Sequence, residues 1–151
     1  QGYGGSPTPC AESNVRNFTA DCREVFAADW PKTITPLDTC GHVVLDGELY
    51  QRVRTADDPL LRALRTNNEL FARNVRWTTY DPTERSSTLF DTVAVYLAFS
   101  EELVEIETLP LVVTDDGHTR IDDAGTPVRC ATAWRDLDAF KRLLVERLLG
   151  G

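Results

Sequence analysis

The chain has 151 residues, 42% of them hydrophobic, so it is long enough for one ordinary hydrophobic core and short for two. Its 24 acidic residues outnumber its 16 Lys and Arg residues, and the resulting charge of −8 repels a phosphate backbone, which argues against nucleic acid as a partner. No apolar run approaches the roughly 20 residues of a membrane span, and the first residues lack the order of a signal peptide. We therefore expect one soluble globular domain over residues 1–151, with neither a nucleic-acid nor a membrane partner.

The chain begins with Gln1 and contains no Met, a pattern expected of a processed product or of an excerpt from a longer protein. Its cysteines have no C-x-x-C spacing and no nearby His spaced for zinc, so we expect mostly buried free thiols. Free thiols agree with a reducing compartment, which predicts a cytoplasmic protein. The four cysteines are Cys10, Cys22, Cys40 and Cys130.

The first half of the chain alternates between helical and extended patterns. Residues 19–28 have the spacing of a short amphipathic helix, and the β-branched and apolar residues 32–37 predict a short strand. Residues 46–55 predict another helix. A longer one follows over residues 57–77, because its acidic start and a proline in the first turn both favour initiation.

In the second half, the continuous apolar run over residues 93–99 predicts a buried helix. Residues 105–113 alternate as a strand does, and residues 120–133 contain two β-like pieces around a turn at residues 123–125. The chain closes with a predicted helix over residues 136–149. Strands separated by helices favour an α/β fold with an open, mostly parallel sheet and flanking helices.

Ligands of such sheets bind at the carboxyl ends of the strands, where Asp38 follows the first predicted strand. Glu12 and Asn14 place two hydrogen-bonding side chains just before a helix, where both could meet a hydroxylated ligand. Their spacing alone also allows a structural role, in which Asn14 or Asn17 caps the helix and Glu12 is a solvated acid.

Asp91 stands between Phe90 and the apolar helix, and an acid in such surroundings needs a partner. Its carboxylate could cap the helix or bind a hard cation such as Ca²⁺, and spacing alone favours the cap. His42 and His118 form no obvious dyad with an acid or a thiol, which favours surface or loop positions for both. The sequence contains no G-x-S-x-G, H-E-x-x-H or P-loop motif.

Three motifs in order and spacing resemble the inosine/uridine-preferring nucleoside hydrolase family. They are Gly-Tyr-Gly-Gly-Ser at residues 2–6 leading into Pro-Cys-Ala-Glu-Ser-Asn at 9–14, Thr-Pro-Leu-Asp-Thr at 35–39, and Leu-Phe-Asp-Thr-Val-Ala at 89–94. The resemblance covers essentially the whole chain and matches roughly the second half of a family member. It implies the C-terminal part of a nucleoside-hydrolase-type fold and a hydrolase that cleaves the N-glycosidic bond of ribonucleosides, releasing base and ribose.

The resemblance also implies roles for individual residues. Glu12 and Asn14 match the family's E-x-N pair, which binds sugar hydroxyls, and Ser6 stands where the family has a ribose-contacting asparagine. Asp91 matches an aspartate that completes a calcium site, in which the ion binds the ribose hydroxyls and the attacking water. Tyr80 lies where family members cover the nucleobase and is a candidate for stacking. Family membership further implies calcium as cofactor and a homo-oligomer in the full-length form.

The sequence departs from the family in ways that bear on catalysis. It has no D-x-D-x-x-x-D-D string, so the general base and most calcium ligands are expected in a missing N-terminal segment. Many members have a histidine before the calcium aspartate that assists the leaving base, and Phe90 cannot donate a proton; Ser13 replaces a residue that is often aromatic. These departures leave base preference open and keep an alternative, a non-catalytic nucleoside- or sugar-binding or interaction protein that retains the fold.

Overall fold

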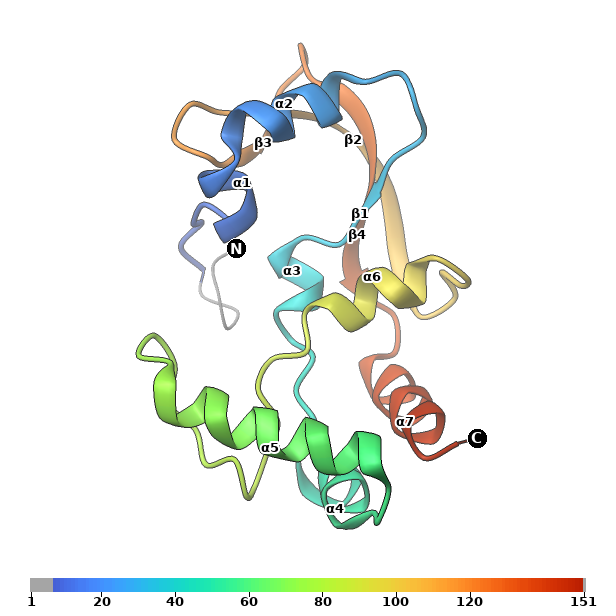
Figure 1. The fold of residues 1–151 in the computed structure, drawn as a ribbon. Coiled ribbons are helices and arrows are strands. Elements are labelled where there is room, and N and C mark those ends of the chain that lie inside the picture. Colours follow the sequence, from blue (N-terminus) through green and yellow to red (C-terminus); the bar gives the residue numbers. More distant parts are fainter. Residues whose placement is uncertain (1–6, 151) are drawn as a thin grey trace. The chain divides into compact units, whose positions relative to one another are not determined.

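A computed structural model describes residues 7–150, which divide into two compact units (Figure 1). We call residues 7–42 and 90–135 the sheet unit, and residues 43–89 and 136–150 the helical unit. Each is described by itself. None of the helices within residues 7–150 combines the length and the apolar character that crossing a bilayer requires.

The sheet unit contains four strands in the order β1-β4-β2-β3, together with four helices in its described residues. Its strands are β1 (Thr33–Ile34), β2 (Val104–Val113), β3 (Thr119–Ile121) and β4 (Thr126–Trp134). Its helices are α1 (Ser13–Asn17), α2 (Thr19–Ala27), α3 (Leu37–Cys40) and α6 (Asp91–Leu97).

Helices combined with an open, mixed sheet confirm the α/β class. β1 pairs with β4 in parallel, whereas β2 pairs with both β4 and β3 in antiparallel directions. The mostly parallel sheet expected from the sequence is therefore corrected to a mixed one. The reason is that no helix separates β2 from β4 in the chain, and a parallel neighbour needs a long crossover connection, usually a helix.

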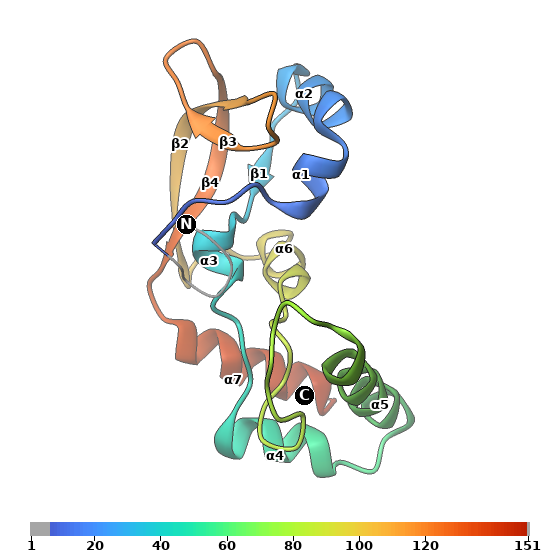
Figure 2. The same ribbon diagram turned by 90° about the vertical axis from the view of Figure 1, so that its left-hand side faces the viewer.

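The core of the sheet unit lies between α2 and the sheet. α2 packs against β2 and β4 on one face of the sheet (Figure 2). Phe26, from α2, packs with Ile34 and Leu109 against three buried residues of β2 and β4: Leu111, Val128 and Cys130. Next to this core, α3 contacts β4, and the Trp134 indole N–H donates to the Thr39 carbonyl at 2.9 Å.

α6 differs from its prediction as a fully buried helix. It packs against α3 with a face that buries Val93 and Tyr96, three residues apart. Val95 and Phe99, four residues apart, are 65% and 63% exposed in the structure. A continuous apolar run contains no periodicity, so the sequence could not show that only one face of this helix is covered.

The helical unit consists of α4 (Gly47–Thr55), α5 (Pro59–Asn74) and α7 (Leu137–Leu148). α4 contacts both other helices, and the shared core contains Leu45, Tyr50, Val53, Leu61 and Val145.

Two extended segments of this unit, residues 43–46 and 85–89, run antiparallel. The Ser86 N–H donates to the Leu45 carbonyl at 2.9 Å, and the Leu89 N–H donates to the Val43 carbonyl at 2.8 Å. These bonds fix the chain that follows α5 against the chain that precedes α4.

Candidate functional site

Glu12 is the N-cap of α1. Its Oε2 accepts the N–H groups of Asn14 at 2.8 Å and Val15 at 3.1 Å. The structural alternative drawn from spacing, in which Asn14 or Asn17 caps the helix, is therefore wrong, because the longer Glu12 side chain folds back onto the first turn. Asn14 sits in that first turn and is exposed.

Asp38 lies where the sequence placed it, after the carboxyl end of β1, in the first turn of α3. α3 is held in place by the Thr39 hydroxyl, which donates to the Ala131 carbonyl of β4. The same helix ends at Cys40, a buried free thiol. The end of β1 thus presents a half-buried carboxylate and a buried thiol on one short helix.

Burial dominates the electrostatics of the Cys40 thiol. It raises the pKa of Cys40 to about 11, and the Thr35 side chain counteracts this through a hydrogen bond. The carboxylates of Glu12 and Asp91 raise the pKa of Cys40 further, as the smallest contributions. Both acids belong to the sheet unit.

Asp91 is the first residue of α6 and is exposed. The N-cap position belongs to Phe90, and α6 has no side-chain cap hydrogen bond, so the capping role that spacing favoured for Asp91 is wrong. A carboxylate in the first turn still interacts favourably with the positive end of the helix. Asp91 therefore faces solvent at a helix start, with its oxygens accessible.

The fit of these residues to calcium can be judged from the donor set. Calcium takes six to eight oxygen ligands, several of them carboxylates. Within residues 7–150, no three His, Cys, Asp or Glu side chains come together as ligands of one ion. Asp91 and its neighbours do not supply a complete set of calcium ligands by themselves, and we assign no chemical step to calcium.

Of the remaining predicted residues, Ser6 lies outside the described part of the chain, and Tyr80 belongs to the helical unit. The Tyr80 hydroxyl donates to Asn68 Oδ1 at 2.7 Å, and the Arg85 guanidinium lies 5.2 Å from its ring centroid. Its pKa is raised, chiefly by burial. Glu12, Asn14 and Asp91 all belong to the sheet unit.

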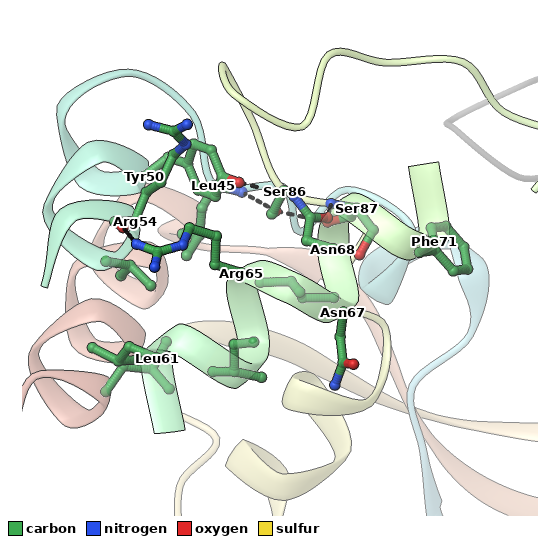
Figure 3. Close-up of a pocket in the computed structure, with 14 residues that line it drawn as sticks. Leu45, Tyr50, Arg54, Leu61, Arg65, Asn67, Asn68, Phe71, Ser86 and Ser87 are labelled. Carbon is green, nitrogen blue, oxygen red and sulfur yellow. Dashed lines mark hydrogen bonds between the residues drawn. The ribbon is translucent and has the colours of Figure 1, made fainter. Parts of the chain in front are cut away.

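A pocket of about 250 Å³ lies within the helical unit (Figure 3). Its walls are mostly apolar and come from α4, α5, α7 and residues 86–89, with Tyr50, Val53, Leu61 and Phe71 among them. No sequence pattern predicts this pocket, because the apolar stripe of α5 has the same pattern as that of a helix that packs into a solid core.

Asn68 is one of the polar residues in the pocket wall (Figure 3). Its Nδ2 donates to the Tyr50 hydroxyl at 2.8 Å and to the Arg85 carbonyl at 3.2 Å. Its Oδ1 accepts from the Tyr80 hydroxyl and from the Ser87 N–H at 2.8 Å. One amide therefore ties α4, α5 and residues 80–87 together.

The hairpin between β2 and β3 holds a dyad that sequence spacing did not reveal. His118 Nδ1 lies 3.1 Å from Asp116 Oδ1. The Thr114 hydroxyl, His118 and nearby positive charge lower the pKa of Asp116 to about 2. His118 does occupy a loop, as expected, but it has an acidic partner there, because the turn at Gly117 reverses the chain between them.

No model of a known protein family matches the chain, and neither does any curated protein.

Proposed function

We propose that this chain contributes the ribose-binding half of a nucleoside hydrolase, which cleaves the N-glycosidic bond of a ribonucleoside with water to give free base and ribose. The observation that supports the proposal is that Glu12, Asn14 and Asp91, which come from the first and the last of the three motifs, all belong to the sheet unit, where Asn14 and Asp91 are exposed. Such a placement is expected if the motifs serve one site.

The sugar contacts would come from α1. Asn14 exposes an amide that can both donate to and accept from ribose hydroxyls. Glu12 fixes the direction of α1 through its cap bonds, which hold the Asn14 backbone in place. In the proposed site Asn14 binds the sugar, and Glu12 orients both the sugar and α1.

The hydrolytic step passes through an oxocarbenium-like ribosyl transition state, in which the bond from C1′ to the base nitrogen breaks as water attacks C1′. A general base must take the proton from that water. Phe90 cannot protonate the leaving nucleobase, so that proton has to come from another group. A nucleobase that departs easily depends least on being protonated.

The alternative is a nucleoside- or sugar-binding protein without hydrolytic activity. Phe90 before Asp91, and Ser13 at a position that is often aromatic in the family, favour it. The two functions share the binding residues and differ in whether sugar is released.

The test compares Asn14→Ala with Asn17→Ala in the protein encoded by the complete reading frame that contains this sequence. Both asparagines are exposed residues of α1, and only Asn14 belongs to the E-x-N motif. Losing one hydrogen bond to a sugar hydroxyl should lower kcat/KM for inosine about tenfold in Asn14→Ala. Asn17→Ala should keep the parent value. Equal effects of the two substitutions would contradict the assignment, and inosine binding without ribose release would establish the non-catalytic alternative.

A further inference from the structure

The pocket of the helical unit contains positive charge without a matching acid. Arg54 at the end of α4 and Arg65 in α5 both line it, and its lining within the described residues includes no Asp or Glu. This is unexpected in a chain with 24 acidic residues and a net charge of −8.

Two other arginines of the same helices have acidic partners. Arg52 Nη2 of α4 lies 2.9 Å from Glu146 Oε1, and Arg62 of α5 pairs with Asp57. Among the ion pairs of residues 7–150, none includes Arg54 or Arg65. The two arginines that line the pocket therefore have no acidic partner in that part of the chain.

The hydrogen bonds around Arg54 and Arg65 do not use all of the N–H donors of the two guanidinium groups. Arg65 Nη1 donates to the Arg54 carbonyl at 2.7 Å and so reaches from α5 toward α4 (Figure 3). Arg54 Nε is buried and has no hydrogen-bond partner in the described part of the chain. A guanidinium carries five N–H donors, and a buried donor without an acceptor costs free energy.

Arg54 acts on the carboxylate of Asp81, which does not line the pocket. Its Oδ1 accepts the N–H of Thr83 at 2.8 Å and its hydroxyl at 2.7 Å. These bonds to Thr83 are the main cause of the lowered pKa of Asp81, and Arg54 contributes least. Asp81 therefore does not supply the missing counter-charge inside the pocket.

We propose that this pocket binds a small monocarboxylate with an apolar or aromatic body. The body would lie among Val53, Leu61 and Leu64, and the carboxylate would accept N–H groups from Arg54 and Arg65. An apolar cavity of about 150 Å³ is enough to bind benzene. The pocket, at about 250 Å³, therefore has room for an aromatic ring and a carboxymethyl group.

This inference does not depend on the proposed hydrolase. Glu12, Asn14 and Asp91 belong to the sheet unit, and every residue that lines the pocket belongs to the helical unit.

The experiment titrates the 151-residue chain with phenylacetate and with phenylacetamide, a neutral molecule of nearly the same shape, in a calorimeter at low salt. Phenylacetate should bind with a dissociation constant below about 1 mM, and phenylacetamide at least about tenfold more weakly, because charge-assisted bonds to a guanidinium are the stronger ones. Added salt should weaken the binding of phenylacetate alone. This comparison needs no variant. Equal binding of the two molecules, or no binding of phenylacetate, would overturn the proposal.

A matched pair of variants then locates the site. Arg65→Gln should weaken phenylacetate binding about tenfold, whereas Arg62→Gln, three residues earlier on α5 and outside the pocket, should leave it unchanged. A similar loss in both variants would show that the anion responds to the overall charge of the helix and would refute the pocket assignment.

Discussion

At the scale of single residues, Asn68 makes the most specific set of contacts in the helical unit. Both of its donors and its acceptor oxygen are used, and its partners come from α4 and from residues 80–87. From the sequence, Asn68 is one polar position on a predicted helix. Its role depends on partners that are distant in the chain, which no local pattern reveals.

Asn68→Ala should lower the free energy of unfolding by about 2–3 kcal/mol, because it leaves several half-buried groups without their partners. Asn74→Ala is the control on the same helix, since its side chain makes a single exposed bond to the Leu70 carbonyl at 2.7 Å. Asn74→Ala should change stability by less than about 0.5 kcal/mol in urea denaturation. Similar denaturation midpoints for the two variants would show that the Asn68 side chain does not join α4, α5 and residues 80–87 as the structure has it.

The cysteines give a second prediction at this scale. All four are free, as expected, with Cys40 and Cys130 buried and Cys10 and Cys22 partly exposed. Burial raises the pKa of both Cys40 and Cys130 to about 11. With the thiolate as the reactive form, these two should react with a thiol reagent at pH 8 about a hundredfold more slowly than an unperturbed thiol.

Reagent kinetics should therefore show Cys40 and Cys130 as the two slowest thiols in the folded chain, and four fast thiols in urea. The same shifts should reduce the free energy of unfolding as pH rises from about 9 to about 11, because the unfolded chain releases these protons first. Four equally reactive thiols without denaturant would contradict the burial of Cys40 and Cys130.

At the scale of elements, the sequence predicted most helices and strands where local signals are strong. α5 begins as expected, with Asp58 Oδ1 accepting the N–H groups of Leu60 at 2.8 Å and Leu61 at 3.2 Å, and with Pro59 in the first turn. β1 is shorter than its prediction, at Thr33–Ile34, because pairing with β4 defines it rather than its own β propensity. Strand direction and the uncovered face of α6 depend on tertiary contacts and were not predictable from local patterns.

The β2–β3 hairpin and α1 pack closely at Gly117. Its φ is +79°, and a Cβ at this position would lie 2.5 Å from the Arg16 Cα. Gly47 also has a positive φ, of +52°, but open space around it. Gly47→Ala should therefore cost about 1 kcal/mol for its backbone conformation alone.

Gly117→Ala should cost about 1–3 kcal/mol more than Gly47→Ala, because the backbone of α1 must move as well. Thermal unfolding of the two variants measures the difference. Equal melting temperatures would show that α1 is not held against the hairpin as the structure has it.

At the scale of the whole molecule, the candidate site and the pocket differ in how far the sequence could predict them. Glu12, Asn14 and Asp91 were singled out by a resemblance of motifs, and the structure adds that all three belong to the sheet unit. The pocket had no motif, because apolar side chains lining a cavity and apolar side chains filling a core follow the same periodicity. Chain length predicts a single domain, and this stays a prediction. The structure itself divides the described residues into two compact units.

We propose that the sheet unit serves a nucleoside hydrolase, and a single assay tests this function. It measures reducing-sugar release from inosine and uridine, with the 151-residue chain and with the product of the complete reading frame, each with and without added calcium. The complete product should release ribose from at least one nucleoside, and the 151-residue chain, whose described residues include no three-ligand metal cluster, should release little or none. Failure of the complete product to release ribose from either nucleoside, under both conditions, would contradict the hydrolase function.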